Sequence, residues 1–375
     1  MEKMLPEICR IQYGYAFDSA KFSDSEGVPL IRIRDVVRGF SETYTTEECG
    51  TEYIVNDGDM LIGMDGEFNI SHWKGGKACL NQRVCRLIPS DEVDALYLYY
   101  FMPKALKAIE DKTPFVTVKH LSAKELNKVV VPMPSMEEQK NIASSLQKVD
   151  ELIALRKEQL AKLDQLVKSQ FVELFGDPET NPYGWKQTTV GEVCSSIVRG
   201  PFGSALKKEF FVEPNETTYK VYEQKHAIQK SATIGTYYIT AEKFDELRRF
   251  ECVAGDILMS CSGTMGELYQ LPEGCEKGLI NQALCKFTLN KKILPIVFLT
   301  YMKQTIGKLE TKGSGIQNIA AVSYVKAMPI NLAPMEVQEQ FAAFVEQTDK
   351  SKLAIQQSLY KLEMLKKSLM QEYFG

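Results

Sequence analysis

Few residues of this 375-residue chain have the types and spacing that catalysis requires. Glu223-Gln224-Lys225 has the E-x-K spacing of a nuclease metal site, but no acidic residue on a preceding predicted strand pairs with it. Asn181-Pro182-Tyr183 lacks the second proline of an Asn-Pro-Pro-Tyr methyltransferase loop and stands in a predicted turn. A phosphate-binding G-x-x-x-x-G-K loop, a G-x-S-x-G elbow and an H-E-x-x-H motif are all missing. We therefore expect a recognition or scaffold subunit and not an enzyme.

The cysteines and histidines also give no sign of a metal site. None of the nine cysteines falls in a C-x-x-C pair, and His72, His120 and His226 are scattered along the chain. We interpret the cysteines as reduced structural thiols. The chain itself is therefore expected to bind no metal or cofactor.

Composition and charge narrow the class of protein. A hydrophobic content of 44% and a charged content of 25% are typical of a globular protein. No run of about 18 apolar residues is present, and Met1–Arg10 has no apolar signal core, so a cytoplasmic protein without a membrane span is expected. The net charge of −4 is unlike that of a free-standing nucleic-acid binder.

Any DNA contact must therefore come from local groups of basic or amide side chains. Such residues occur in or near predicted loops between strands, although a solvated surface is the alternative for each group taken alone. The candidates are Arg32, Arg34, Lys74 and Lys77 in the first half, and Arg199, Lys207, Lys208, Gln224, Lys225 and Thr264 in the second.

The element that organises the chain is a long segment that occurs twice. Residues 136–176 align without a gap on residues 335–375, and 14 of the 41 positions are identical. Each copy lacks internal glycine and proline, and the first copy starts with a Ser135/Glu138 capping box and ends at Gly176. We predict two helices over about 137–174 and 336–373, each following a globular domain.

Apolar residues in these segments follow a heptad rhythm, which is typical of helices packed as a coiled coil. We predict an antiparallel pair with a pseudo-two-fold axis and with the two domains at opposite ends. The alternative is that each helix caps only its own domain. The residues predicted to make helix contacts to partners are Leu146, Val149, Ile153, Leu160, Leu163, Leu359 and Leu362.

The globular halves are related as well. Gly58-Asp59-Met60-Leu61-Ile62 matches Gly255-Asp256-Ile257-Leu258-Met259, and Leu80-Asn81-Gln82 matches Ile280-Asn281-Gln282. Short β-branched runs predict strands, and the stretches near 93–109 and 295–310 predict helices. We expect mixed α+β domains at 1–133 and 177–332, with spacer helices at 134–176 and 333–375.

These features resemble the specificity subunit of type I restriction–modification systems over essentially the whole chain. The resemblance rests on the helix starts Pro134-Ser135-Met136-Glu137-Glu138-Gln139 and Pro334-Met335-Glu336-Val337-Gln338, on both Phe-Gly helix ends, and on the paired domain motifs. The second domain begins with Trp185-Lys186, and the first domain has no equivalent tryptophan at its start.

The resemblance implies a non-catalytic DNA-recognition subunit. Each domain would read one half of a bipartite, asymmetric site in double-stranded DNA, and the helices would set the spacer and dock methyltransferase subunits. S-adenosylmethionine, ATP and Mg²⁺ would be bound by the methyltransferase and restriction subunits. The alternative is a non-DNA coiled-coil scaffold that carries two related binding modules.

Overall fold

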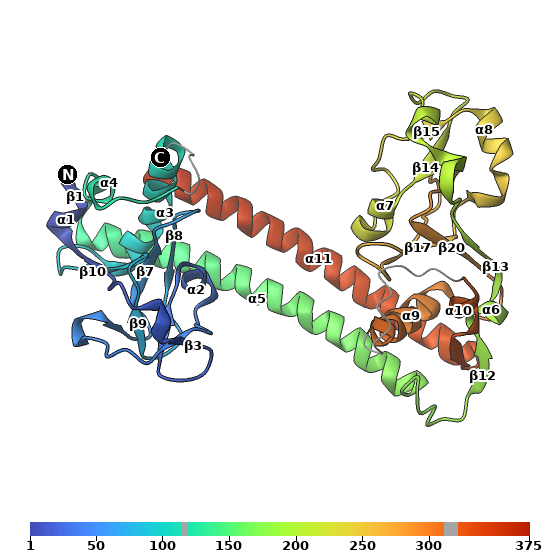
Figure 1. Cartoon of the computed structure of the whole chain (residues 1–375), viewed down its shortest axis with the longest axis horizontal. Coiled ribbons are helices and arrows are strands. Elements are labelled where there is room, and N and C mark those ends of the chain that lie inside the picture. The colour runs from blue at the N-terminus through green and yellow to red at the C-terminus, as the bar shows by residue number, and fades with distance from the viewer. Residues whose placement is uncertain (114–118, 311–321) are drawn as a thin grey trace. The chain divides into compact units, whose positions relative to one another are not determined.

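The computed structural model describes residues 1–113, 119–310 and 322–375. These residues form two compact units, unit 1 with Met1–Glu158 and Gln356–Gly375, and unit 2 with Gln159–Ile355. Two helices of 40 residues each, α5 (Met136–Phe175) and α11 (Met335–Phe374), pass through both units (Figure 1). Each unit therefore contains about one half of α5 and one half of α11.

Unit 1 contains an antiparallel sheet and a mixed sheet. The antiparallel sheet has the order β2 (Cys9–Tyr13), β10 (Val84–Pro89), β7 (Met60–Gly63), β8 (Asn69–His72). The mixed sheet has the order β3 (Phe22–Ser23), β5 (Tyr44–Thr45), β4 (Val28–Ile31), β9 (Ala78–Leu80), β6 (Ile54–Val55). The helices before α5 are α1 (Leu5–Ile8), α2 (Ile33–Arg38), α3 (Ala95–Lys112) and α4 (Ala123–Leu126), and short 3-10 turns are η1 (Ser19–Lys21) and η2 (Thr51–Tyr53).

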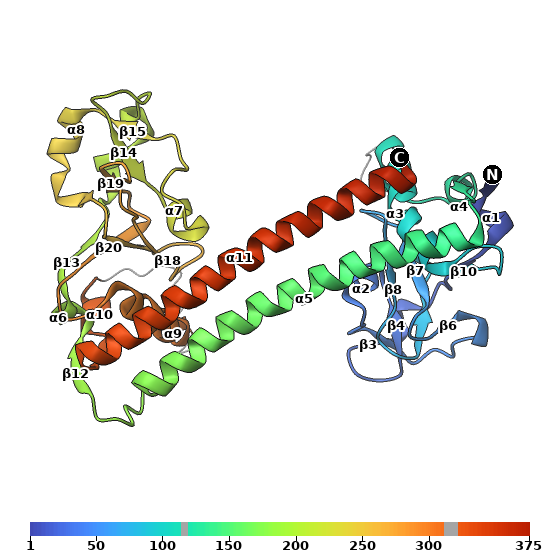
Figure 2. The ribbon, with the colours of Figure 1, turned by 180° about the vertical axis from the view of Figure 1, so that it is seen from behind.

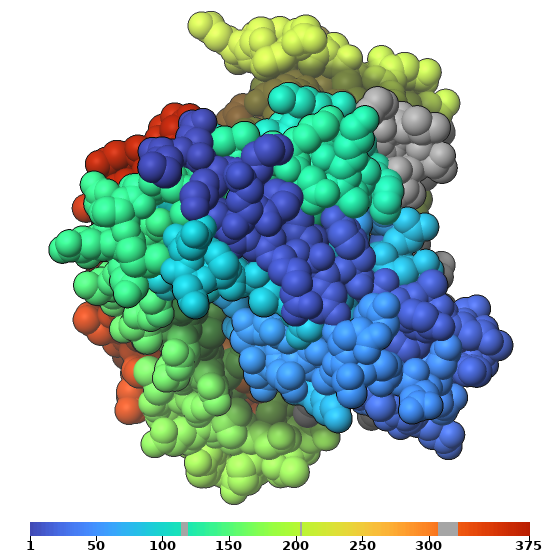
Figure 3. All heavy atoms as spheres, turned by 90° about the vertical axis from the view of Figure 1, so that its left-hand side faces the viewer, coloured from blue at the N-terminus to red at the C-terminus, as the bar shows by residue number. Residues whose placement is uncertain are grey.

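A short two-stranded sheet of β1 (Glu2–Met4) and β11 (Val130–Pro132) joins the start of the first domain to its end. The backbone N–H of Leu5 donates to Val129 O at 2.8 Å just beyond it. Figure 3 shows the N-terminal segment in the darkest blue at the surface of unit 1, next to the teal-to-green residues that lead into α5. Both ends of the domain are thus brought to the start of α5.

Unit 2 repeats this arrangement. Its antiparallel sheet has the order β13 (Cys194–Arg199), β20 (Leu284–Leu289), β17 (Ile257–Ser260), β18 (Leu268–Gln270), and its mixed sheet the order β15 (Tyr238–Ile239), β14 (Tyr219–Tyr222), β19 (Gly278–Ile280), β16 (Glu251–Cys252). The two-stranded sheet is formed by β12 (Lys186–Thr189) and β21 (Pro329–Leu332). Its shorter helices are α6 (Val190–Val193), α7 (Gln224–Gln229), α8 (Ala241–Glu246), α9 (Pro295–Glu310) and α10 (Val322–Ala327), with 3-10 turns η3 (Gly203–Leu206), η4 (Lys208–Phe210) and η5 (Arg248–Phe250).

The strand register shows that the two units are built alike. Ile31 of β4 pairs in parallel with Leu80 of β9, and Tyr222 of β14 pairs in parallel with Ile280 of β19. The residue that follows each strand pair is therefore equivalent, so that Arg32 corresponds to Glu223 and Asn81 to Asn281. The predicted repeat of two mixed α+β domains and the predicted helices near 93–109 and 295–310 are confirmed.

In each unit the two long helices lie side by side and run antiparallel. In unit 1, Lys366 Nζ lies 2.6 Å from Asp150 Oδ1, and Lys157 Nζ lies 3.7 Å from Glu363 Oε1. In unit 2, Lys352 Nζ lies 2.7 Å from Asp164 Oδ1. As residue numbers rise along α5, those of the paired residues fall along α11. Figures 1 and 2 show the same pairing of α5 and α11 from both sides.

The helix ends enter the hydrophobic cores. In unit 1, Leu146 of α5 and Phe374 of α11 belong to one buried cluster with Tyr97 and Phe101 of α3. In unit 2, Phe171 and Phe175 of α5 pack with Phe341 of α11 at ring-centroid distances of 5.3 and 5.5 Å. Because the last turn of each helix is buried with the domain that does not precede it, the alternative in which each helix caps only its own domain is wrong.

The repeated residues at the helix starts have a structural role. Gln139 is almost fully buried, and its Oε1 accepts the backbone N–H of Asp94, the residue before α3, at 2.9 Å. Gln338 in the second copy accepts the N–H of Leu294, the residue before α9, at the same distance. The predicted capping box is present, since Glu138 N–H donates to Ser135 Oγ at 3.3 Å and Ser135 N–H to Glu138 Oε2 at 2.9 Å.

All nine cysteines are free thiols, and seven of them are buried. Burial raises the pKa of Cys9 to about 11 and that of Cys194 to about 12, so these thiols stay protonated and unreactive. The interpretation of the cysteines as structural thiols is confirmed. Among the described residues, none of the helices combines the length and the apolar content that a membrane crossing would need.

Candidate nucleic-acid interface

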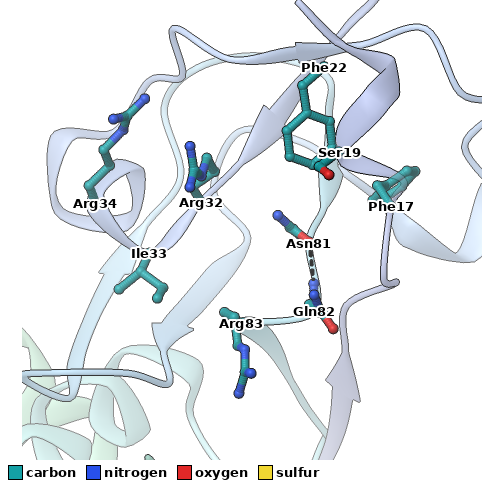
Figure 4. Close-up of a pocket in the computed structure, with 9 residues that line it drawn as sticks. All are labelled: Phe17, Ser19, Phe22, Arg32, Ile33, Arg34, Asn81, Gln82 and Arg83. Atoms are coloured by element: carbon teal, nitrogen blue, oxygen red, sulfur yellow. Dashed lines mark hydrogen bonds between the residues drawn. The ribbon is translucent and has the colours of Figure 1, made fainter. Parts of the chain in front are cut away.

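In unit 1, the predicted residues Arg32 and Arg34 lie at the start of α2, directly after β4. The fully buried Asp35 fixes this turn, because its Oδ2 accepts the backbone N–H of Arg32 at 2.8 Å. Both arginines line a hollow of about 480 Å³ (Figure 4). The other residues that line it are Phe17, Ser19, Phe22, Ile33, Asn81, Gln82 and Arg83.

Another wall of the hollow is a turn that begins at Asn81. Asn81 Oδ1 accepts the backbone N–H of Gln82 at 2.8 Å, and its backbone carbonyl accepts the N–H of Val84 at 2.9 Å. A Cβ atom on Gly14 would lie 2.1 Å from Asn81 O, so only glycine allows this close approach. The repeated Asn-Gln motif thus shapes a turn that leaves the side chains of Gln82 and Arg83 exposed.

In unit 2, the equivalent turn after β14 carries Glu223, Gln224 and Lys225. Gln224 Nε2 donates to Thr264 O at 3.4 Å, and its Oε1 accepts the hydroxyl of Ser262 at 3.3 Å. The structure therefore brings together two residues predicted from separate segments, Gln224 and Thr264. They lie on a polar surface that offers amide and hydroxyl groups, which are the groups that read adenine and other base edges in DNA.

The two equivalent surfaces differ in charge. The positions held by Arg32, Arg34 and Arg83 in unit 1 are held by Glu223, Lys225 and Ala283 in unit 2. Lys225 is moreover paired with Glu223, at a distance of 2.7 Å between Nζ and Oε2. A common backbone therefore presents three arginines in unit 1 and the Glu223/Lys225 ion pair in unit 2. Two of the arginines also lie near a carboxylate, since Arg34 Nε is 3.6 Å from Asp35 Oδ1 and Arg83 Nε is 3.5 Å from Asp65 Oδ2.

The Glu223/Lys225 ion pair also explains the E-x-K spacing. The two side chains neutralise each other on one turn. Over residues 1–113, 119–310 and 322–375, no group of three His, Cys, Asp or Glu residues has the geometry to hold a metal ion. In this structure the Glu223 and Lys225 side chains of that spacing form an ion pair with each other.

The remaining candidates belong to other segments of the two domains. Lys74 is exposed beside Gly39 at the end of α2, and Lys77 is exposed before β9. Lys207 and Lys208 are exposed on the segment after β13, where Lys207 Nζ lies 3.6 Å from Glu209 Oε1. Arg199 is 8% exposed and its Nε donates to Gln282 O at 2.9 Å, so this side chain is held largely inside the domain.

The helix residues predicted for partner contacts are buried or half-buried in the described structure. Leu146, Val149 and Ile153 are buried in unit 1. Leu160, Leu163, Leu359 and Leu362 are half-buried along the helix pair. Other apolar residues are exposed on the helices of unit 1, and we call them the unit 1 helix surface: Leu152, Leu155, Tyr360 and Met364.

Gln82 and Arg83 line the hollow but were not among the residues predicted from the sequence. The signal was available, because the matched motifs Leu80-Asn81-Gln82 and Ile280-Asn281-Gln282 mark the same turn in both halves. The first position after the motif differs, Arg83 against Ala283. A shared turn followed by a diverged, exposed residue is the pattern expected where related domains bind different ligands.

The model of the type I restriction modification DNA specificity domain matches residues 1–165 and 182–364. The chain belongs to this family and contains the domain twice, as the resemblance predicted. A DNA specificity domain in both halves does not favour the alternative of a non-DNA scaffold.

Curated relatives match over one half of the chain. The specificity subunit of the type I restriction enzyme EcoBI from Escherichia coli is 40% identical over 164 residues, which cover 43% of this chain and 34% of that subunit. The MjaVIII specificity subunit from Methanocaldococcus jannaschii is 28% identical over 143 residues, which cover 38% of this chain and 34% of that subunit. The matched region thus spans about a third of the length of these relatives.

Solved structures match the fold along the whole chain. The S subunit of the type I restriction–modification system from M. genitalium aligns with a TM-score of 0.57 and 15% identity, covering 100% of this chain and 96% of that one. A chain from a structural study of complex assembly and conformational transition in a type I system aligns with a TM-score of 0.62 and 16% identity, covering 100% and 97%. At these identities the likeness concerns the fold alone.

Proposed function

We propose that this chain is the specificity subunit of a type I restriction–modification complex and that each of its two domains reads one half of a bipartite, asymmetric DNA site. The observation that carries the proposal is the pair of equivalent turns, 32–34 with 81–83 and 223–225 with 281–283, on a shared backbone. Because their side chains differ, the two half-sites should differ in sequence. The limits 1–133 and 177–332 for the two reading domains belong to the proposal.

The long helices would set the distance between the half-sites. A 40-residue helix is about 60 Å long, and a pair of such helices is far stiffer than a loop. The number of unread base pairs between the half-sites would then depend on helix length. Each unit contains one half of α5 and one half of α11. Each domain is therefore connected to the other through two helices and not through a single segment, which supports this role.

The reaction itself would belong to partners. Methyltransferase subunits would bind S-adenosylmethionine and flip the target adenine out of the duplex, and restriction subunits would use ATP and Mg²⁺. These partners would also supply phosphate contacts, which fits the net charge of −4 of this chain. The complex would act in the cytoplasm, where the DNA is.

Docking of the methyltransferase subunits is proposed for the unit 1 helix surface. Tyr360 is 64% exposed and Leu155 52% exposed, and large apolar side chains on a helix face are typical anchors of a protein interface. Leu152 and Leu155 are three residues apart, and Tyr360 and Met364 four apart, so each pair lies on one face of its helix.

Methylation mapped over a whole genome tests the proposal. The chain is expressed with the methyltransferase subunit of its own system in a host that lacks methylation of this type, and methylated adenines are located by long-read sequencing. We expect one bipartite motif. Replacing residues 177–332 by the corresponding domain of a relative should change one half of the motif only. A change in both halves, or methylation without a motif, contradicts the proposal.

A further inference from the structure

Arg83 lies immediately after the Asn81 turn, at the start of β10, and its side chain is 50% exposed. It lines the hollow of unit 1 together with Arg32 and Arg34, although it comes from the turn between β9 and β10 and they lie at the start of α2 (Figure 4). Arg34 is partly engaged, because its Nη2 donates to Thr43 Oγ1 at 3.2 Å. The surroundings of Arg83 are different and point to a specific use.

Two side chains lie next to the Arg83 guanidinium. Arg83 Nε lies 3.5 Å from Asp65 Oδ2, and Arg83 Nη1 lies 3.3 Å from Nδ1 of His120. His120 Nδ1 is however only 2.6 Å from Asp65 Oδ1. A contact of that length to a carboxylate requires Nδ1 to carry the proton and to donate it, so Nδ1 cannot also accept from Arg83.

The outer edge of the guanidinium therefore remains available. Nε faces Asp65, and within the described part of the chain the one hydrogen-bond contact of Nη1 or Nη2 is the 3.3 Å approach of Nη1 to His120 Nδ1, which donates to Asp65 and so does not act as an acceptor. These two groups form a planar pair of donors. Such a pair matches the O6 and N7 acceptors of guanine in the major groove, which is the most common base-specific contact of arginine.

The backbone holds the three residues in register. Met64 N–H donates to Arg83 O at 3.0 Å, and Leu121 N–H donates to Met64 O at 2.7 Å. Asp65 and His120 face each other across an antiparallel bridge. The positions of Asp65, Arg83 and His120 thus follow from main-chain hydrogen bonds, and the guanidinium is oriented before any ligand arrives.

We propose that Arg83 reads a guanine in the half-site of the first domain, with Asp65 as its positioning residue and His120 holding Asp65. This proposal rests on the function proposed above. In unit 2 the equivalent positions are Ser262 for Asp65 and Ala283 for Arg83, so the second domain reads the corresponding base pair without an arginine.

The test uses the complex of this chain with its methyltransferase subunits and a library of duplexes in which each position of the mapped motif is varied. For R83A we expect discrimination at one G·C pair of the first half-site to fall by about 5- to 150-fold. Every position of the second half-site should keep its preference. R38A is the matched control, because Arg38 is 46% exposed and pairs with one carboxylate, Glu42, in the same unit but outside the hollow.

Two further variants separate base reading from charge and from folding. R83K keeps the charge but not the planar pair of donors, so it should lose the same discrimination with an unchanged salt dependence. D65N should weaken the preference at that position alone, whereas a merely structural role would lower thermal stability and affinity at all positions. If R83A fails to fold, the base preference of R83K decides whether Arg83 reads the guanine.

Two results overturn the proposal. One is an unchanged preference at every position in R83A and R83K. The other is a uniform loss of affinity in R83A with a smaller salt slope, which identifies a phosphate contact. If the wild-type complex methylates DNA without sequence preference, the proposed function itself is refuted. The assignment of Arg83 is then refuted as well.

Discussion

Asp35 and His226 occupy the same position in the two units and accept the same hydrogen bond. Asp35 Oδ2 accepts the backbone N–H of Arg32 at 2.8 Å, and His226 Nδ1 accepts the backbone N–H of Glu223 at 2.8 Å. Both side chains are fully buried. A carboxylate in one domain and a neutral imidazole in the other thus close the turns on which the candidate DNA-contacting residues stand.

This relationship predicts a pH dependence that is specific to unit 2. His226 Nδ1 accepts the backbone N–H of Glu223 and Nε2 lies 2.7 Å from Ile234 O, which fits a neutral ring with its proton on Nε2. Nδ1 also lies 3.0 Å from the carbonyl oxygen of Glu223. Burial lowers the pKa of His226 below its usual value. Because protonation then favours the unfolded state, the stabilisation is complete above about pH 6.5 and is lost as the pH falls through the folded-state pKa.

We expect the Tm of unit 2 to drop below about pH 6.5 in the wild type and to drop less in H226N, whose side chain still accepts a hydrogen bond. Each unit contains one tryptophan, so the fluorescence of Trp185 in a W73F background reports on unit 2. H120N in the exposed cluster of unit 1 is the control. Equal pH profiles for the wild type and H226N would contradict the assignment.

Gly200 should tolerate no side chain. A Cβ atom there would lie 1.9 Å from the backbone oxygen of Asn281, so the Asn281 turn would have to move. We expect G200A to cost about 1–3 kcal/mol of stability in unit 2 and to impair reading of the second half-site. G274A is the control, since its Cβ would meet open space and only the positive φ of 76° opposes it. Equal losses in stability would show that the turn adapts.

Phe374 should stabilise the first domain although it is the penultimate residue of the chain. Its side chain is 6% exposed and packs on Tyr97 and Phe101 at centroid distances of 5.4 and 5.8 Å. We expect F374A to destabilise unit 1 by about 3–5 kcal/mol. Thermal unfolding followed by Trp73 fluorescence in a W185F background measures this. Y360A, an exposed aromatic residue on the same helix, should be nearly neutral, and equal effects would refute the packing role.

Charged substitutions on the unit 1 helix surface should weaken binding of the methyltransferase subunits. L155E and Y360E each place a carboxylate where we propose an apolar contact, and we expect affinity to fall by about 5- to 30-fold or more per substitution. Circular dichroism should show an unchanged fold, because both side chains are exposed. K361E is the control on the same helix. Normal binding by both variants would place the docking surface elsewhere.

The helix pair should measure the DNA spacer. Four residues add about one helical turn, or 6 Å, and little rotation, whereas a base pair adds about 3.4 Å and 34°. Four residues inserted after Leu160, balanced by four after Leu359, should lengthen the preferred spacer by one or two base pairs while the half-sites stay the same. The turn at Gly176-Asp177-Pro178 is expected to absorb the residual rotation. Methylation only at the original spacing would contradict this role.

The repeat, the two long helices and their antiparallel pairing can be predicted from the amino-acid sequence. Helix limits depend on local signals such as the Ser135/Glu138 capping box and Gly176, whose φ is +77°. The heptad spacing and the ungapped offset between the copies then require equivalent positions to meet equivalent partners. The candidates Arg32, Arg34, Gln224 and Thr264 could likewise be found, because they follow strands whose limits the sequence indicates.

Which polar side chains face outward and which converge depends on the three-dimensional packing of the domains. Arg199 has the same charge as Arg83, but a carbonyl group contributed by Gln282 holds it inside the domain. Arg83 is joined by Asp65 and His120, which lie 18 and 37 positions away along the chain, through main-chain hydrogen bonds between separate segments. Side-chain burial and convergence depend on such long-range pairing, and no local pattern in a single sequence encodes it.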